Sequence, residues 1–434
     1  MNDTAAARAP RATTKRGSKW LRALGPGLIT GAADDDPSGI ATYSQAGAQF
    51  GYQLSWTMLL TYPLMVTVQE ISARLGRTTG LGIAGNLRLH HPRSALAIAC
   101  LLFAANVCNI GADLGAMAAA TQLLLPRLPT AASLLCWGAI CAISPLLFSY
   151  RQYLSVLRWL TLSLFAYFGA LLFAHTDWSA LLHSLVWPTI GIHDKDAWLT
   201  LVAVLGTTIS PYLFFWQASQ EVEATRASRS RQPLRNSPGQ ALSALSRIRI
   251  DTRIGMAFSN AVGLAIITTA AATLHVHGVT SIDSAPQAAE ALRPIAGRFA
   301  SALFALGILG TGLLSVPVLA GSAAYAVGES RRWRVGLNRR PMQAKAFYAT
   351  MVIATLVGML ANVSGISPMR ALILSAVINA LVAVPVMVFL MIMAADGRIM
   401  RRFVVKGPSR AVGWLATAVM ALASSAFLVS LIPK

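Results

Sequence analysis

Eleven apolar segments, each long enough to cross a bilayer, dominate this chain. They lie near residues 24–48, 53–73, 95–116, 131–149, 153–174, 198–220, 254–274, 299–327, 346–362, 370–394 and 411–432. A spanning helix needs about 20 apolar residues, and inside hydrocarbon its backbone must satisfy its own hydrogen bonds. The 434 residues are 55% hydrophobic and only 12% charged, whereas a soluble protein carries about 25% charged residues. We therefore predict an all-α polytopic protein embedded in a lipid bilayer.

The basic residues predict the orientation of these segments. If the N-terminus is cytoplasmic, all but six of the 36 Lys and Arg residues fall on the cytoplasmic side, the exceptions being Arg127, Lys195, Arg293, Arg298, Arg370 and Lys434. Such a bias is the positive-inside rule. It accounts for the net charge of +20 without nucleic acid as a partner. We expect an integral protein of the inner or plasma membrane, with a disordered basic cytoplasmic tail at residues 1–22.

Three consecutive acids, Asp34, Asp35 and Asp36, lie near the centre of the first apolar segment and are followed by Pro37–Gly39. An ionised Asp at the middle of a spanning helix costs roughly 2.5–3.5 kcal/mol on insertion scales. Packing alone does not explain three of them. Acids beside a helix-breaking sequence at the bilayer midplane are typical of a cation site lined by broken backbone.

A second break is predicted in the sixth segment, at Gly206–Tyr212. Pro211 removes a backbone donor there and clashes with the preceding turn. Proline kinks are common in membrane helices, so Pro211 alone also has a purely structural reading. However, segments one and six run in opposite directions. Broken helices at corresponding positions of two inverted halves indicate the substrate site of a secondary transporter.

Several short sequences resemble the Nramp divalent-metal transporters. Asp36–Gly39 stands where that family has Asp-Pro-Gly-Asn, and the other matches are Gly25–Gly27, Gln45–Ala48, Gly51–Tyr52, Ala73–Gly76, Thr79–Gly80 and Ala112–Leu114. The resemblance extends from about residue 24 to residue 400. It implies a transmembrane transporter domain over residues 23–434. It also implies about 11 transmembrane helices in a 5+5 inverted-repeat (LeuT-like) fold, with helices 1 and 6 broken.

The chain departs from the family pattern at five positions. Gly39 replaces the metal-binding Asn, Ser210 replaces the Met ligand, Tyr212 and Gln217 replace two His residues, and Ala116 replaces an acid. This pattern resembles the Nramp-related magnesium transporter branch. That branch implies transport of Mg²⁺, with Mn²⁺ also carried, and loss of the proton route.

The chemistry of the substitutions agrees with that branch. Thioether sulfur selects soft metals, whereas carboxylate, carbonyl and water suit Mg²⁺ and Mn²⁺. Mg²⁺ usually keeps several waters and binds through one or two carboxylates. We expect Asp36 to supply the principal charge and Gly39 to leave space. The predicted metal group is Asp36, Ala33, Gly39, Thr207 and Ser210, with Ala33 and Thr207 contributing carbonyls.

Seven further polar residues are candidates for the access route or vestibule: Asp34, Asp35, Asp113, Tyr212, Gln217, Glu221 and Glu223. On helical spacing, Asp34 and Asp35 cannot both face the same site as Asp36. For Asp113, a structural carboxylate is an equal alternative. For Glu221 and Glu223, the alternative is a solvated helix end.

Other features have structural interpretations. Asn106 and Asn109 suit hydrogen bonding between helices, Glu70 suits an i,i+4 ion pair with Arg74, and residues 225–253 suit a flexible linker. Cys100, Cys108, Cys136 and Cys141 suit small buried hydrophobes. The GxGxxG match at Gly80–Gly85 lacks the preceding strand of a nucleotide site.

These observations favour a carrier over an enzyme, since the chain has no HExxH or nucleophile-elbow pattern. We expect no cofactor apart from the transported Mg²⁺ or Mn²⁺, and no obligate protein partner. The leading hypothesis is import of divalent cations by alternating access without obligatory proton coupling. A proton-coupled Mn²⁺ or Fe²⁺ symporter is the alternative, followed by a sodium-coupled carrier of organic solutes.

Overall fold

The computed structural model describes residues 30–31, 33–147, 165–188, 195–228 and 230–432, apart from the side chains of residues 294 and 295. Within these ranges all regular structure is helical. The long helices are α3 (Pro37–Phe50), α4 (Trp56–Thr79), α6 (Pro92–Leu124), α7 (Thr130–Leu147), α11 (Lys195–Thr208), α12 (Pro211–Arg226), α13 (Ala241–Thr273), α16 (Ala300–Ser330), α17 (Lys345–Ala361), α18 (Pro368–Ala395) and α20 (Pro408–Ser430).

Shorter helices connect the long ones. They are α5 (Ile83–His90), α9 (Phe165–Phe173), α10 (Trp178–Val186), α14 (Ala285–Glu290), α15 (Arg293–Ala296) and α19 (Gly397–Met400). Single 3-10 turns occur at η2 (Pro238–Gln240), η3 (His275–His277), η4 (Gly297–Phe299), η5 (Pro341–Gln343), η6 (Asn362–Ser364) and η7 (Arg401–Phe403).

The described helices account for the predicted apolar segments. Eight are long and apolar enough to cross a membrane: Pro92–Leu124, Thr130–Leu147, Lys195–Arg226, Pro238–His277, Gly297–Ser330, Lys345–Ser364, Pro368–Ala395 and Pro408–Ser430. The first and second predicted segments correspond to α3 and α4. The fifth predicted segment lies mostly outside the described residues, which include only its end, α9. The predicted tail at residues 1–22 also lies outside them.

The helix boundaries follow local sequence rules. Proline occupies the start of α3, α6, α12, α18 and α20, where its missing N–H costs nothing and its fixed φ suits the first helical turn. At the end of α4, Gly80 adopts a φ of 74° and its N–H bonds to the Gly76 carbonyl. Only glycine takes that left-handed conformation without strain.

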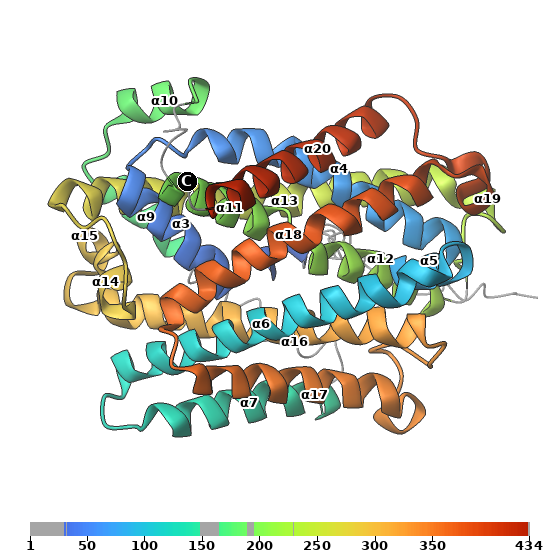
Figure 1. Ribbon diagram of the computed structural model, residues 1–434, viewed down its shortest axis with the longest axis horizontal. Helices are drawn as coiled ribbons and strands as arrows, with labels where there is room; N and C mark the ends of the chain where they lie inside the picture. Colours follow the sequence, from blue (N-terminus) through green and yellow to red (C-terminus); the bar gives the residue numbers. More distant parts are fainter. Residues whose placement is uncertain (1–29, 32, 148–164, 189–194, 229, 433–434) are drawn as a thin grey trace, which may run out of the picture.

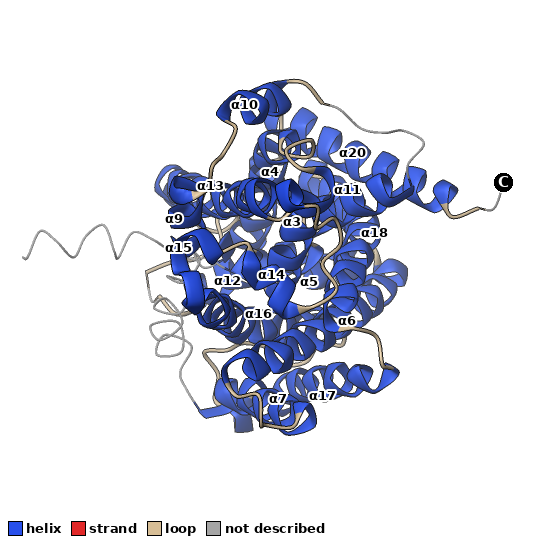
Figure 2. Cartoon of the chain, turned by 90° about the vertical axis from the view of Figure 1, so that its left-hand side faces the viewer, coloured by secondary structure: helices blue, strands red, loops and turns tan. Residues whose placement is uncertain are grey.

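The helices pack as an elongated bundle (Figure 1). α6 and α16 lie against each other through the middle, and α3, α11 and α18 pack together beside them. Both views place α7 and α17 at one edge and α10 and α20 at the opposite edge (Figures 1 and 2). The two broken helices, which include α3 and α11–α12, are therefore surrounded by longer helices.

Small residues let the first broken segment lie directly on α13. A Cβ atom on Gly31 or Gly47 would come within 2.2 Å of the carbonyl oxygen of Gly255 or Ile267. Such an approach is sterically forbidden for any larger residue. Close backbone contact of this kind is how membrane helices gain packing energy where lipid removes the hydrophobic drive. The first broken segment thus contacts α13 on both sides of its break, through Gly31 before it and through Gly47 in α3 after it.

The predicted flexible linker is wrong for residues 230–253. The N–H groups of Leu234 and Arg235 donate to the carbonyls of Arg77 and Thr78 at 3.1 and 3.2 Å. The Arg77 guanidinium donates to the Gln232 carbonyl at 2.5 Å. α13 then begins at Ala241, so the segment docks on the end of α4. Arg and Ser content suggested flexibility, but the backbone groups find partners on the neighbouring helix.

Two side-chain predictions also fail. Glu70 pairs with Arg253 at 3.1 Å and not with Arg74, because α13 packs beside α4 and supplies a closer base. Arg74 instead donates to the Val404 carbonyl at 3.3 Å. Of the four cysteines, only Cys141 is buried; Cys100, Cys108 and Cys136 lie on outward-facing helix surfaces. In a membrane protein, an apolar outward surface is a lipid contact, and hydropathy alone does not distinguish it from the core.

Asn106 behaves as predicted. Its side-chain amide donates across to α16, to the Leu319 carbonyl at 2.8 Å and to the Ser322 hydroxyl at 2.6 Å.

Candidate functional site

The first broken helix ends at the acids and restarts at the proline. Residues 30–34 are helical at their described positions, the chain bends at Asp35, and α3 begins at Pro37. Asp36 has extended backbone, with φ −71° and ψ 170°, and its Oδ1 accepts the N–H of Gly39 at 2.7 Å. This is N-capping, which sets one carboxylate oxygen at the positive end of α3.

The second broken helix is interrupted over two residues, Ile209 and Ser210, between α11 and α12. Ser210 occupies the N-cap position of α12, but its hydroxyl turns back and donates to the carbonyls of Gly206 at 2.8 Å and Thr207 at 2.7 Å. Its single proton is shared between these two carbonyls. The oxygen lone pairs of Ser210 therefore remain at the break.

The two breaks lie side by side. A Cβ atom on Gly39 would be 3.2 Å from the Thr207 hydroxyl and 3.5 Å from Asp36 Oδ1. The Tyr212 hydroxyl donates to the Ala33 carbonyl at 2.9 Å, which joins the second break to the first. The structure thus brings together Asp36, Ala33, Gly39, Thr207 and Ser210, the five residues proposed from the sequence as a metal group.

A polar network from three other helices meets Asp36 on its second oxygen. Asn109 on α6 donates to Asp36 Oδ2 at 3.0 Å and also faces Asp113 Oδ2 at 3.5 Å. Asn379 on α18 donates to the Asn109 amide oxygen at 3.1 Å. Ser315 on α16 donates to Asp113 Oδ2 at 2.7 Å. Asp36 and Asp113 therefore belong to one hydrogen-bonded cluster.

Part of this network is not predicted from the sequence. Asn109 suits hydrogen bonding between helices, yet it contacts the principal acid directly. Its position one turn before Asp113 on α6 is the signal that could have placed it at the site. Asn379 stands out as a lone amide in the middle of the apolar α18. Ser315 carries no comparable signal, because serine is common on packed membrane helices.

Asp34 and Asp35 face a different neighbour. Ser259 on α13 lies 2.5 Å from Asp34 Oδ2 and 3.2 Å from Asp35 Oδ1. Neither acid bonds to the Asn109 network. Gln217, the third candidate near this break, accepts a hydrogen bond from the Thr30 hydroxyl through its Oε1, while its amide nitrogen has no hydrogen-bond partner within the described ranges.

The four acids at the breaks are buried, and no described Arg, Lys or His forms an ion pair with them. Asp34, Asp35, Asp36 and Asp113 are at most 2% exposed. Among the described residues, the ion pairs all involve other carboxylates. Asp113 keeps one oxygen without a hydrogen-bond partner in the described part of the chain, whereas a purely structural carboxylate would have both oxygens satisfied. Buried charge needs compensation, so the cluster is suited to hold cations.

Glu221 and Glu223 lie at the far end of α12, and their alternative as solvated side chains is wrong. They are 1% and 6% exposed. Glu221 pairs with Arg247 at 2.5 Å, and Glu223 accepts from the Asn338 amide at 2.9 Å. Both carboxylates are thus engaged by protein groups rather than lining an open vestibule.

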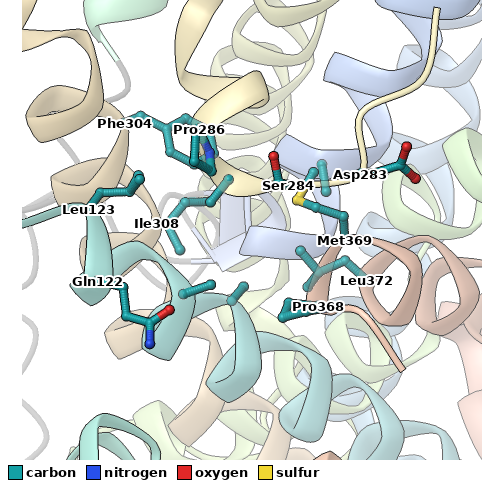
Figure 3. A pocket seen from close by; sticks show the side chains of 14 residues that line it. Gln122, Leu123, Asp283, Ser284, Pro286, Phe304, Ile308, Pro368, Met369 and Leu372 are labelled. Carbon is teal, nitrogen blue, oxygen red and sulfur yellow. The ribbon is translucent and has the colours of Figure 1, made fainter. Parts of the chain in front are cut away.

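A cavity of about 320 Å³ approaches the breaks from the end of the bundle that carries Asp283 (Figure 3). Its polar lining residues include Asp283, Ser284 and Gln122 (Figure 3). Its lining also includes Ala41, Ala116 and Leu372. The Leu372 carbonyl accepts the Ser38 hydroxyl at 3.1 Å, and Ala116 lies one turn beyond Asp113 on α6. The cavity therefore comes within about one helical turn of the acid cluster.

Within the described part of the chain, no three Asp, Glu, His or Cys side chains converge as a ready-made metal cluster. An ion at the breaks would have to draw on amide, hydroxyl and carbonyl oxygens and on water. That donor set suits hard cations.

Comparison with known proteins agrees with this architecture. The family model described as "Natural resistance-associated macrophage protein-like" matches residues 27–430. A curated relative, the divalent metal cation transporter MntH of Burkholderia ambifaria, is 30% identical over 409 residues, covering 92% of this chain and 86% of the relative.

Solved structures give the same fold. A crystal structure of the Eremococcus coleocola manganese transporter superposes with a TM-score of 0.75 at 17% identity, covering 96% of this chain and 87% of that one. Mhp1, a nucleobase-cation-symport-1 family transporter in a closed conformation, gives 0.58 at 14% identity, covering 94% and 91%. The predicted all-α inverted-repeat fold with two broken helices is thereby confirmed.

Proposed function

Since the chain belongs to the Nramp family, whose model spans residues 27–430, we propose that it carries divalent metal cations across a membrane. The observation that carries this proposal is the meeting of two helix breaks around buried carboxylates without cationic partners. Curated relatives of similar length are divalent metal cation transporters, which supports the same substrate class.

We propose Mg²⁺ as the first substrate and Mn²⁺ as the second. Position 210 offers a hydroxyl oxygen and position 39 offers no side-chain donor. Oxygen donors suit ions that dehydrate reluctantly. Asp36 supplies the principal charge. The carbonyls of Ala33 and Thr207 already accept hydrogen bonds from Tyr212 and Ser210, which leaves each with one free acceptor position. Water then completes the coordination shell.

The access route in this proposal is the cavity that opens near Asp283. Its lining contains few charged groups, so a hydrated ion passes through it without strong binding before it reaches Asp36. Alternating access would then open the opposite end of the bundle, in a protein whose N-terminus is cytoplasmic. Transport proceeds down the ion gradient and membrane potential without obligatory proton coupling.

A second candidate is a proton-coupled importer of Mn²⁺ or Fe²⁺. One observation favours it: Asp113 has an oxygen without a partner and reaches Asp36 through Asn109. A sodium-coupled carrier of organic anions is less compatible with the site, because four buried acids repel a carboxylate substrate.

Uptake into proteoliposomes tests the proposal. We would measure Mg²⁺ and Mn²⁺ entry with metal-sensitive dyes and lumenal pH in parallel, for the wild type and Asp36→Asn. Mg²⁺ entry that depends on Asp36 and leaves lumenal pH unchanged is the expected result. Mn²⁺ entry that acidifies the lumen, with no Mg²⁺ entry, would move the chain to the proton-coupled class. Equal uptake by Asp36→Asn would reject the site.

A further inference from the structure

Asp34 and Asp35 together have fewer hydrogen-bond donors than two buried carboxylates need. The Ser259 hydroxyl has one hydrogen, yet it lies within hydrogen-bond distance of both acids, at 2.5 and 3.2 Å. It can donate to only one of them at a time. Asp34 Oδ1 and Asp35 Oδ2 have no hydrogen-bond partner among the residues that the structure describes, and the two residues are 1% and 0% exposed. Buried acceptors left this bare indicate a missing positive group.

One transported ion does not supply enough charge. Asp34, Asp35, Asp36 and Asp113 are the four buried acids near the breaks, and no Arg, Lys or His among the described residues pairs with any of them. A divalent ion at Asp36 offsets two negative charges and is shared with Asp113 through the Asn109 network. Asp34 and Asp35 lie outside that network, so in their ionised form they call for a separate cation.

The backbone and a neighbouring tyrosine favour a cation at this place. Asp34 and Asp35 stand at the end of the first half-helix, where unpaired carbonyls give partial negative charge. Tyr43 lies close enough to interact electrostatically with both acids. Its hydroxyl is 3.3 Å from Thr208 Oγ1, whose own hydrogen is directed to the Val204 carbonyl at 2.5 Å. The surroundings are thus oxygen atoms from carboxylate, hydroxyl and phenol groups.

We propose that Asp34, Asp35 and Ser259 form a second cation position, distinct from Asp36, that takes a hard metal cation. The proposal rests on the proposed function, because it adds an ion to the same pair of helix breaks. Two sources fit this chemistry, a second copy of the transported divalent ion or a sodium ion. A bound cation here would tie the first half-helix to α13 through Ser259.

Equilibrium dialysis of the purified full-length protein tests the proposal directly. Radioactive Mn²⁺ is titrated once in sodium buffer and once in N-methylglucamine buffer, and radioactive Na⁺ is measured separately. Wild type, Asp36→Asn and Asp34→Asn/Asp35→Asn are compared. Two Mn²⁺ ions per chain, one of them lost in the double variant, support a divalent occupant. One Mn²⁺ together with Na⁺ binding that the double variant abolishes supports a sodium occupant.

Other outcomes separate this inference from the proposed function. One Mn²⁺ per chain that is lost in Asp36→Asn and kept in the double variant, with no Na⁺ binding, overturns the second position and leaves the transport proposal standing. No Mn²⁺ binding by the folded wild type overturns both. Size-exclusion profiles and melting temperatures show which variants are folded.

Ser259→Ala keeps the argument testable if the double variant does not fold. Losing a group that orients a metal-binding carboxylate weakens affinity by about 10-fold or more. We expect that loss at the second position only. Ser424→Ala is the matched control, since Ser424 is also a buried serine and lies on α20 away from the breaks. Equal affinities for the two serine variants at the second position would count against the proposal.

Discussion

Two groups of buried carboxylates in this molecule have opposite surroundings. At the basic end of the bundle, which carries Arg88, Arg226 and Arg401, Glu329 accepts the N–H groups of Gly82 at 3.0 Å and Gly85 at 2.9 Å. Glu221 nearby pairs with Arg247, and Glu223 accepts from the Asn338 amide. Among the described residues, Asp34, Asp35 and Asp113 each keep one oxygen without a hydrogen-bond partner, as Glu221 also does, but none of these three acids has a basic residue in an ion pair with it. Burial alone therefore does not reveal function, whereas the lack of a cationic partner points to a missing ion.

Glu329 also explains the GxGxxG sequence. Its carboxylate caps the first turn of α5 from the end of α16, and a Cβ atom on Gly82 would lie 2.5 Å from Glu329 Oε2. The glycines thus admit a carboxylate of the chain itself to a helix N-terminus, a position that favours negative charge. The nucleotide interpretation was rightly set aside, but sequence alone did not suggest this partner.

The largest expected effect comes from Asp36→Asn. Asparagine is as good an N-cap as aspartate, so α3 and the fold should persist while the charge is lost. We expect metal uptake to fall by at least about 100-fold, beyond the effect typical of outer-shell substitutions. Dye-based uptake beside a thermal melt of the same preparation would check this. If the melting temperature falls so far that the variant is mostly unfolded under the uptake conditions, the comparison fails, because the acid would then be structural.

Glu329→Ala is expected to act in the reverse way. It leaves the N–H groups of Gly82 and Gly85 buried without an acceptor, at about 1–3 kcal/mol for each such group. Stability should fall, while uptake per folded molecule stays near that of the wild type. Thermal melts combined with uptake normalised to folded protein would measure both. Normal stability with lost uptake would place Glu329 among the transport residues.

Tyr212→Phe should have an intermediate effect on stability and metal affinity. It tests whether the Ala33 carbonyl is a metal ligand. Removing one buried hydroxyl–carbonyl bond costs about 1 kcal/mol of stability and frees the Ala33 carbonyl. We expect tighter metal binding in dialysis, since the Ala33 carbonyl no longer shares its lone pairs with a hydroxyl donor. Unchanged or weaker binding would mean that the Ala33 carbonyl is no ligand.

Asp396→Asn should have the smallest effect. Asp396 lies just beyond α18, and hydrogen bonds from the Arg398 side chain and backbone lower the pKa of its carboxyl below the ordinary value. A lowered folded-state pKa means that the stabilisation is present at neutral pH and is lost as pH falls through that pKa, below about 4. For this surface pair we expect a loss of about 0–1 kcal/mol. A pH series of melts on both proteins would show them converging in acid.

Much of the fold was predictable from the sequence because membrane helices are coded by length, hydropathy and proline position. Asp36–Pro37 and Ser210–Pro211 located both breaks, and charge bias matched the segment count. Contacts between distant helices were not predictable. Arg253 displaced Arg74 as the partner of Glu70, and Asn379 reached Asn109 from α18, because such pairs depend on which faces meet. The outward cysteines show the same limit, since lipid and core are both apolar.

The hydrogen bond from Tyr212 to the Ala33 carbonyl has a mechanical consequence. It crosslinks the interrupted helices of the two repeats at the point where each is weakest. Moving one break by itself would leave the buried Ala33 carbonyl without this hydrogen bond. We therefore expect the two half-helices to move together as one rigid unit. The protein should then switch between its two faces in a single concerted step, with one relaxation rate rather than separate rates for each repeat.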